Sequence, residues 1–93
     1  MTGIFNTDIS KISVSIVPNP TNGKLKVIVE GGKNNDFMVS ISDFIGKVVY
    51  EESILSETGS FSKHIDLSNV PKGVYLLKIQ SKDVREVNKI VIF

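Results

Sequence analysis

The sequence predicts an all-β domain, either a sandwich or a barrel. Seven short segments are rich in β-branched and aromatic residues, and most of them alternate apolar with polar side chains as half-buried strands do. Turn signals made of Pro, Gly, Asn and Asp separate these segments at a spacing of about ten residues. No window carries the 3.6-residue apolar period of an amphipathic helix. These three observations together favour a small all-β architecture.

The composition of the chain excludes several classes of function. The 93 residues suffice for one domain, and 11 Lys and Arg residues against 10 Asp and Glu leave a net charge of +1. Because the lysines are also scattered, we expect no nucleic-acid partner. With no Cys and one His, the chain excludes a disulfide framework, thiolate chemistry and a multi-histidine metal centre within one chain. No apolar run approaches the ~18 residues of a membrane span.

Residues 1–11 are irregular and polar, and we expect them to be a linker or a vector-derived segment. They lack the basic region and the long apolar region of a signal peptide. The chain is therefore either a cytoplasmic protein or a piece of a longer one. We expect the folded domain to span residues 12–93.

The first predicted strand covers residues 12–16, where apolar residues alternate strictly with serine. The segment 18–23, Pro-Asn-Pro-Thr-Asn-Gly, follows it. Its two prolines lack backbone donors, and Asn22-Gly23 is a strong turn signal. We expect a rigid corner, longer than a two-residue hairpin, at which the chain crosses between sheets.

Three more strands are predicted over residues 24–30, 37–42 and 47–51, the last two forming a hairpin. Between the last two, Asp43 to Gly46 forms a tight turn, since Asp accepts hydrogen bonds from the backbone and Gly adopts left-handed conformations. The inward-facing residues of the first two strands are predicted to be Leu25, Val27, Val29, Phe37, Val39 and Ile41.

Residues 52–59 are predicted to be a looser link with at most a short helical turn. A fifth strand follows over 61–67, in which Lys63 shares the parity of the apolar residues and must therefore either lie near an edge or extend its ammonium group to solvent. The turn Pro71-Lys72-Gly73 leads into a strand over 74–79. Because both of its faces are largely apolar, we expect this strand to be central in its sheet. The last strand is predicted over 84–93.

Several residues are candidates for chemistry. Ser62, His64 and Asp66 contain the residue types of a catalytic triad, but on one strand they stand in a row, so a solvated polar face is the better interpretation. Gly31-Gly32 precedes no helix and is better read as a flexible loop than as a phosphate loop. The run 34–36 carries one carboxylate, too few for a calcium site.

The remaining candidates are two lysines and two tyrosines. Lys24 and Lys26 share an exposed strand face, where lysines are normally just solvated. Tyr50 and Tyr75 could stack on a sugar, but packing roles are better supported. Nothing assembles into an active site, so we expect no enzyme, no cofactor and no metal.

The order and spacing of the motifs resemble those of a known family. The corner at 18–23, the turn and strand at 43–49, and the segments 65–68, 71–79 and 88–92 resemble the type A C-terminal sorting domain of the type IX (Por) secretion system of Bacteroidota. The resemblance covers about residues 12–93. It departs from the family at Ser81-Lys82-Asp83, where the last hairpin often carries a Gly. The family's marked positions correspond here to Pro18, Asn19, Pro20, Gly23, Asp43, Gly46, Gly73, Tyr75, Lys89, Ile90 and Val91.

The resemblance implies an immunoglobulin-like antiparallel β-sandwich at the C-terminus of a larger secreted protein. Such a domain is a non-catalytic address. It directs cargo from the periplasm through the type IX translocon and its shuttle protein to the cell surface or the medium. A sortase-like protease then commonly removes it, and the cleavage site lies upstream of the proline-rich corner. The resemblance implies no membrane span of its own.

The terminal segment 87–93 carries apolar residues on both parities, and a two-layer sandwich hides only one of them. Either loops and neighbouring side chains cover the second face, or this face or the strand edge docks onto the secretion machinery by strand addition. We also expect that isolated copies can dimerise through exposed edges. Two other functions remain open: a carbohydrate-binding or adhesive module, and a fragment of a cytoplasmic enzyme.

Overall fold

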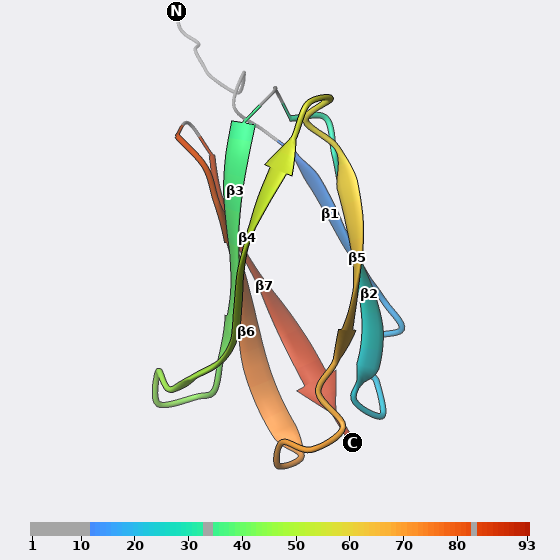
Figure 1. Ribbon diagram of the computed structural model, residues 1–93. Coiled ribbons are helices and arrows are strands. Elements are labelled where there is room, and N and C mark those ends of the chain that lie inside the picture. Colours follow the sequence, from blue (N-terminus) through green and yellow to red (C-terminus); the bar gives the residue numbers. More distant parts are fainter. Residues whose placement is uncertain (1–11, 33–34, 83) are drawn as a thin grey trace, which may run out of the picture.

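The computed structural model describes residues 12–32, 35–82 and 84–93. The predicted linker at 1–11 lies outside the described residues. The described residues form seven strands (Figure 1). Their bounds are β1 Ser13–Val17, β2 Lys24–Glu30, β3 Asn35–Ser42, β4 Val48–Ser56, β5 Phe61–Asp66, β6 Gly73–Gln80 and β7 Arg85–Ile92.

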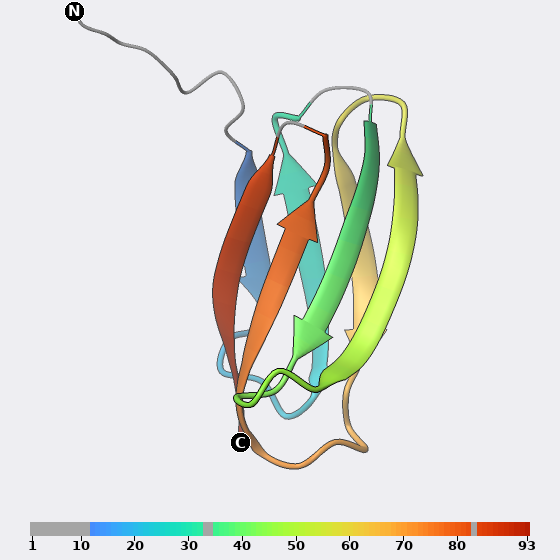
Figure 2. The same cartoon turned by 90° about the vertical axis from the view of Figure 1, so that its left-hand side faces the viewer.

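The strands form two packed antiparallel sheets, so the predicted β-sandwich is confirmed. One sheet has the order β1-β2-β5 and the other the order β4-β3-β6-β7, and Figure 2 shows the four-stranded layer in front of the three-stranded one. The first, second and fifth strands thus make one layer, while the third, sixth and seventh lie in the other, as in immunoglobulin-type sandwiches. As predicted, β6 lies inside its sheet, between β3 and β7.

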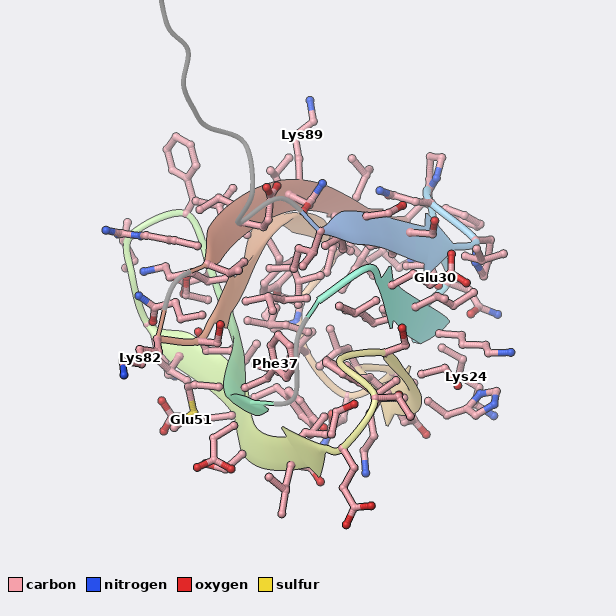
Figure 3. The ribbon with its side chains drawn as sticks, turned by 90° about the horizontal axis from the view of Figure 1, so that it is seen from above. Lys24, Glu30, Phe37, Glu51, Lys82 and Lys89 are labelled. Carbon is pink, nitrogen blue, oxygen red and sulfur yellow. The ribbon has the colours of Figure 1, made fainter. Side chains whose placement is uncertain are left out.

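The core lies between the sheets and consists of inward-facing residues from both layers. Phe37 is 1% exposed, and its ring centroid lies 5.2 Å from that of Phe61 on the opposite sheet. In Figure 3 Phe37 points into the space between the layers, whereas Lys24, Glu51 and Lys89 point away from it. All six residues that the alternation predicted to face inward on β2 and β3 are buried. The period of two in the sequence therefore identified the buried faces correctly.

The predicted loose link at 52–59 is wrong, because β4 continues to Ser56. Along this extension Ser53 pairs with Met38, Ile54 with Phe37, and Leu55 with Asp36. The alternation is hard to see in the sequence, since a carboxylate, Glu52, takes an inward position there.

The predicted crossing between sheets at the corner 18–23 is also wrong. β1 and β2 pair with each other in one sheet, with Val14 opposite Val29 and Val17 opposite Lys26. The corner is nevertheless longer than a two-residue hairpin, as expected. It is wide enough for Thr21 to reach across and form a parallel bridge with Ile92 in the other sheet.

A polar cluster links the two sheets along the side where β4 and β5 lie. The Lys63 ammonium of β5 lies 3.0 Å from a carboxylate oxygen of Glu52 on β4, and the other carboxylate oxygen accepts a hydrogen bond from the Tyr50 hydroxyl. Lys63 therefore lies at a sheet edge, as predicted. The Tyr50 hydroxyl, and after it the Lys63 ammonium, hold the pKa of Glu52 below its usual value. Burial, followed by the hydrogen bond to Glu52, raises the pKa of Tyr50 to about 12.

This cluster predicts a loss of stability at high pH. In the unfolded chain Tyr50 loses its proton near the ordinary value of 10, whereas in the folded protein it keeps it to about 12. Tyr50 therefore stabilises the fold below pH 10, and this contribution is lost as the pH rises toward 12. Denaturant titrations across that range should show the free energy of unfolding falling more steeply in the wild type than in Tyr50→Phe. Equal slopes in the two proteins would contradict the interpretation.

Candidate functional site

The marked motif residues, far apart in the sequence, gather at one end of the sandwich. The β1–β2 corner, the β3–β4 turn, the β5–β6 link and the last residues of the chain all lie at the end opposite the N-terminal side of β1 (Figures 1 and 2). We call this the motif end. The order of the motifs along the chain could be read from the sequence, but their meeting at one end could not.

Asn19 connects the corner to the terminal strand by side-chain hydrogen bonds. Its Nδ2 donates to the Lys89 carbonyl over 2.8 Å, and its Oδ1 accepts from the Val91 amide over 3.0 Å. The side-chain amide thus presents to β7 the same donor and acceptor that a neighbouring strand would present. Pro18 and Pro20 flank it, and their peptide bonds to Val17 and Asn19 are cis.

Thr21 continues the same pairing with its backbone. Its amide donates to the Val91 carbonyl over 2.8 Å, and its carbonyl accepts from the Phe93 amide over 2.9 Å. Its side chain is fully buried, and the hydroxyl donates to the Lys24 carbonyl while accepting from the Gly23 amide. Thr21 was not singled out from the sequence. The available signal was a hydroxyl residue placed two positions before Gly23, which is where a side chain can close a local turn.

Gly23 is required for two separate reasons. Its φ of +118° lies in the region that side-chain-bearing residues avoid, and a Cβ there would lie 2.8 Å from the Ser68 Cα. Its carbonyl also accepts a hydrogen bond of 2.7 Å from the Leu67 amide. The corner is thereby held against the end of β5 on one side and against β7 on the other.

The β3–β4 turn has the predicted chemistry. Asp43 Oδ1 accepts from the Ile45 amide over 3.0 Å and from the Lys47 amide over 2.8 Å, and Gly46 has a φ of +95°. The turn raises two apolar side chains into solvent, because Phe44 and Ile45 are both 86% exposed. These two residues form the most exposed apolar tip among the large described side chains.

Tyr75 is a structural residue. Its ring is 3% exposed, and its hydroxyl donates to the Pro71 carbonyl four residues upstream. A tyrosine near the start of the sixth strand that bonds back to the preceding link is the tyrosine corner of Greek-key sandwiches. A shallow hollow of about 370 Å³ lies between this link and the β3–β4 turn, lined by both.

The marked residues therefore divide into three groups by their burial. Gly23, Tyr75 and Ile90 are buried and act in folding. Asp43, Gly73 and Val91 are half-buried, and Gly73 has a φ of +148°. The members that a partner can reach most freely are Pro18, Asn19, Pro20, Gly46 and Lys89.

The terminal strand has one covered and one open face. Ile90 and Ile92 are buried, whereas Val87 is 49% and Phe93 64% exposed, and Val91 is half-buried. Of the two alternatives for the second face, complete cover by loops and neighbours is therefore wrong for Val87 and Phe93.

The structure keeps Ser62, His64 and Asp66 apart as a row on the outer face of β5, where all three are exposed. His64 lies opposite Lys26, and Asp66 accepts a hydrogen bond of 2.9 Å from the Ser68 amide. Hydrogen bonding from the Ser68 side chain, and after it from the Ser68 amide, lowers the pKa of Asp66. The interpretation as a polar strand face is confirmed.

The other candidates give no ligand site in the described part of the chain. Lys24 is exposed and lies opposite Asp66, and Gly32 bonds to Gly59 in a loop–loop contact. The run 34–36 lies partly outside the described residues. Within residues 12–32, 35–82 and 84–93, no group of three or more potential metal-ligating side chains comes together, and no helix is long and apolar enough to cross a bilayer.

Comparison with known proteins agrees with the geometry. Residues 15–93 match the family described as "Secretion system C-terminal sorting domain", the Por secretion tail. The match begins in β1 and includes every motif that forms the motif end. No curated protein matches the chain.

Replacing Gly23 should be far more harmful than replacing a glycine with free space around it. In Gly23→Ala both the φ of +118° and the backbone contact at 2.8 Å oppose the new methyl group, so we expect a loss of roughly 3 kcal/mol or more in the free energy of unfolding. Gly46→Ala is the matched control, because its φ is also positive but nothing lies within 4 Å; it should cost about 1–2 kcal/mol. Equal losses measured by urea titration would contradict the steric argument.

Removing the Asn19 amide should loosen the terminal strand. Asn19→Ala loses both hydrogen bonds to β7, so we expect a loss of about 1–2 kcal/mol in the free energy of unfolding and faster hydrogen exchange at the Val91 amide. Asn19→Asp keeps the acceptor for Val91 and should preserve more of that protection. The control is Asn69→Ala, at an exposed position in the β5–β6 link. Unchanged exchange at Val91 in Asn19→Ala would show that the side chain does not hold the strand.

Proposed function

The chain belongs to the family of Por secretion system C-terminal sorting domains, and from this premise we propose that its motif end is the surface by which the type IX machinery recognises it. It is a C-terminal sorting domain of type IX secretion cargo, and it is a non-catalytic sorting signal. The family implies that it interacts with the secretion machinery and that its cargo is secreted or carried to the cell surface.

The observation that supports the proposal is the convergence of the motifs at the motif end. Pro18, Asn19, Pro20 and Lys89 are exposed there and joined by hydrogen bonds between Asn19 and β7. A partner that binds this end meets the corner and the terminal strand together. Recognition would then depend on the folded domain and would fail for an unfolded tail of the same sequence.

The same proposal names the individual partners of the domain. The cargo passes through the periplasm, and the outer-membrane translocon and its shuttle protein read the motif end during export. A sortase-like protease then removes the domain by cutting upstream of the corner, within or before residues 1–11. The domain remains a transient address on a longer protein.

An adhesive or carbohydrate-binding module is less well supported. Such a module needs an exposed aromatic platform with polar groups beside it. Trp is absent from the chain, and the exposed aromatic side chains that the structure describes, Phe44 and Phe93, carry no polar group. Tyr75 is in the core, and Tyr50 is half-buried with its hydroxyl bonded to Glu52. Neither tyrosine offers a free ring face of the kind that stacks on a sugar.

The proposal is tested by export of a reporter. Residues 12–93 are fused to the C-terminus of a fluorescent protein that carries an N-terminal periplasmic signal, in hosts with and without the type IX translocon. We expect the fusion in the medium or at the cell surface only when the translocon is present. The untagged reporter should stay in the periplasm in both hosts. A tagged reporter that also stays in the periplasm of the intact host would overturn the proposal.

Deleting residues 89–93 would not separate recognition from folding. The deletion removes Ile90 and Ile92 from the core and the backbone partners of Thr21. The loss of two buried isoleucines costs several kcal/mol by itself. Substitutions of exposed side chains are therefore the informative variants.

A further inference from the structure

The outer side of the four-stranded sheet carries an exposed apolar strip over β6 and β7. In an antiparallel pair, directly opposed residues share a face, and the register places Val74 opposite Val91 and Leu76 opposite Lys89. Val74, Leu76, Val87 and Phe93 are between 39% and 64% exposed. We call the outward side chains of these two strands, together with Phe93, the β6–β7 outer face.

The same face is cationic. Its charged members are Lys78, Arg85 and Lys89, and the described outward positions of β6 and β7 include no carboxylate, because Glu86 has the inward parity of Ile90. Three positive charges on one face contrast with a net charge of +1 for the whole chain. Lys78 lies opposite Val87, and Lys89 lies opposite Leu76, so cations and apolar side chains alternate across the pair.

The edge of β7 is closed to strand addition where the motif end lies. Four backbone groups along the edge of β7 are hydrogen-bonded to Asn19 and Thr21. They are the Lys89 carbonyl, the Val91 amide and carbonyl, and the Phe93 amide. A partner strand would first have to displace the buried Thr21. The face of β7 carries no such obstruction, so its side chains are more accessible than its edge.

We propose that the β6–β7 outer face docks against a protein surface that is apolar and bears carboxylates, supplied by the secretion machinery. This inference rests on the function proposed above. Apolar contact supplies the attraction, and each of the three cations can pair with one carboxylate of the partner, which also orients the domain. The docking surface thus extends beyond the marked motif residues to Leu76, Lys78 and Val87.

The arrangement favours a protein partner over an anionic lipid surface. Membrane-binding faces separate their apolar side chains from the basic ones, so that the former enter the acyl region while the latter stay with the headgroups. Here Lys89 lies between Val87 and Val91 on the same strand face. Inserting the apolar strip into lipid would carry the lysine with it, whereas a protein surface can meet each side chain separately.

The reporter fusion tests the inference with variants matched between the two sheets. Leu76→Thr with Lys78→Glu changes the β6–β7 outer face, and Ile28→Thr with Lys26→Glu makes the same change on the outer face of β2, the central strand of the other sheet. We expect export to fall about tenfold or more in the first variant, which corresponds to losing one or two good contacts. Export of the second variant should equal that of the wild type.

The outcomes separate this inference from the function it rests on. If the wild-type fusion is not exported, the proposed function fails. If the wild type is exported and the Leu76→Thr, Lys78→Glu variant is exported equally, the docking face alone is overturned. Lys78→Glu by itself, which leaves Leu76 in place, should also reduce export while the thermal unfolding of the purified chain stays close to wild type; unaltered export of this folded variant would equally overturn the role of the cations.

A vesicle experiment decides the class of partner. The purified chain is mixed with vesicles of phosphatidylcholine and phosphatidylglycerol and sedimented. We expect the chain to remain in the supernatant. Sedimentation of the wild type that is lost in Lys78→Glu would assign the face to anionic lipid and overturn the protein partner.

Discussion

The pairing of Thr21 with Val91 and Phe93 is the contact on which the candidate site depends. It joins a residue of the first connection to the last residue of the chain, and it fixes β7 at the side of the sheet where an unpaired edge would otherwise remain. The Thr21 side chain can be buried there because its hydroxyl bonds to Lys24 and Gly23. Gly23 in turn permits the close approach to Ser68 that holds the corner in place.

Asn19 continues the pairing that closes the edge of β7, which we call the seal, and it does so with its side-chain amide where a neighbouring strand would use its backbone. Because its amide bonds both Lys89 and Val91, the two outermost motifs of the sequence become one structural unit. Each holds the other in the geometry in which a partner can read it.

Under the proposed function the domain has to fold before the secretion machinery can bind it, and its residues divide accordingly. The buried members, among them Tyr75 and Ile90, keep the strands in register, while exposed members such as Asn19 and Lys89 remain available. The β6–β7 outer face adds a second readable surface next to the motif end. Its apolar and cationic side chains project from the same strands whose inner faces build the core. Because successive side chains point to opposite faces, one strand supplies both the core residues and the proposed docking residues.

Much of the fold followed from alternation. On β2 the buried face was predicted correctly from Leu25, Val27 and Val29, and the limits of the strand were predicted from the turns that flank it. The end of β4 was missed because Glu52 faces inward, where Lys63 of another sheet neutralises it. A carboxylate at an inward position interrupts the apolar alternation, so the segment is predicted to be a loop unless the partner strand is known.

The site was less accessible to sequence reasoning. The marked residues were found by resemblance, yet their convergence depends on the pairing of chain segments about 70 residues apart, as with Asn19 and Lys89. Thr21 was overlooked because a threonine between a proline and an asparagine carries no signal of burial. The docking face was foreseen only as a choice between the face and the edge of β7, and the hydrogen bonds to Asn19 and Thr21 were needed to favour the face.

The most direct test is an NMR measurement of scalar couplings across hydrogen bonds in the purified, isotope-labelled chain. If the corner seals the terminal strand, couplings should connect the Phe93 amide nitrogen to the Thr21 carbonyl carbon and the Thr21 amide nitrogen to the Val91 carbonyl carbon. Both amides should also exchange slowly with solvent. Absence of both couplings together with fast exchange, in a chain whose β2, β3 and β6 amides remain protected, would contradict the seal and the site built on it.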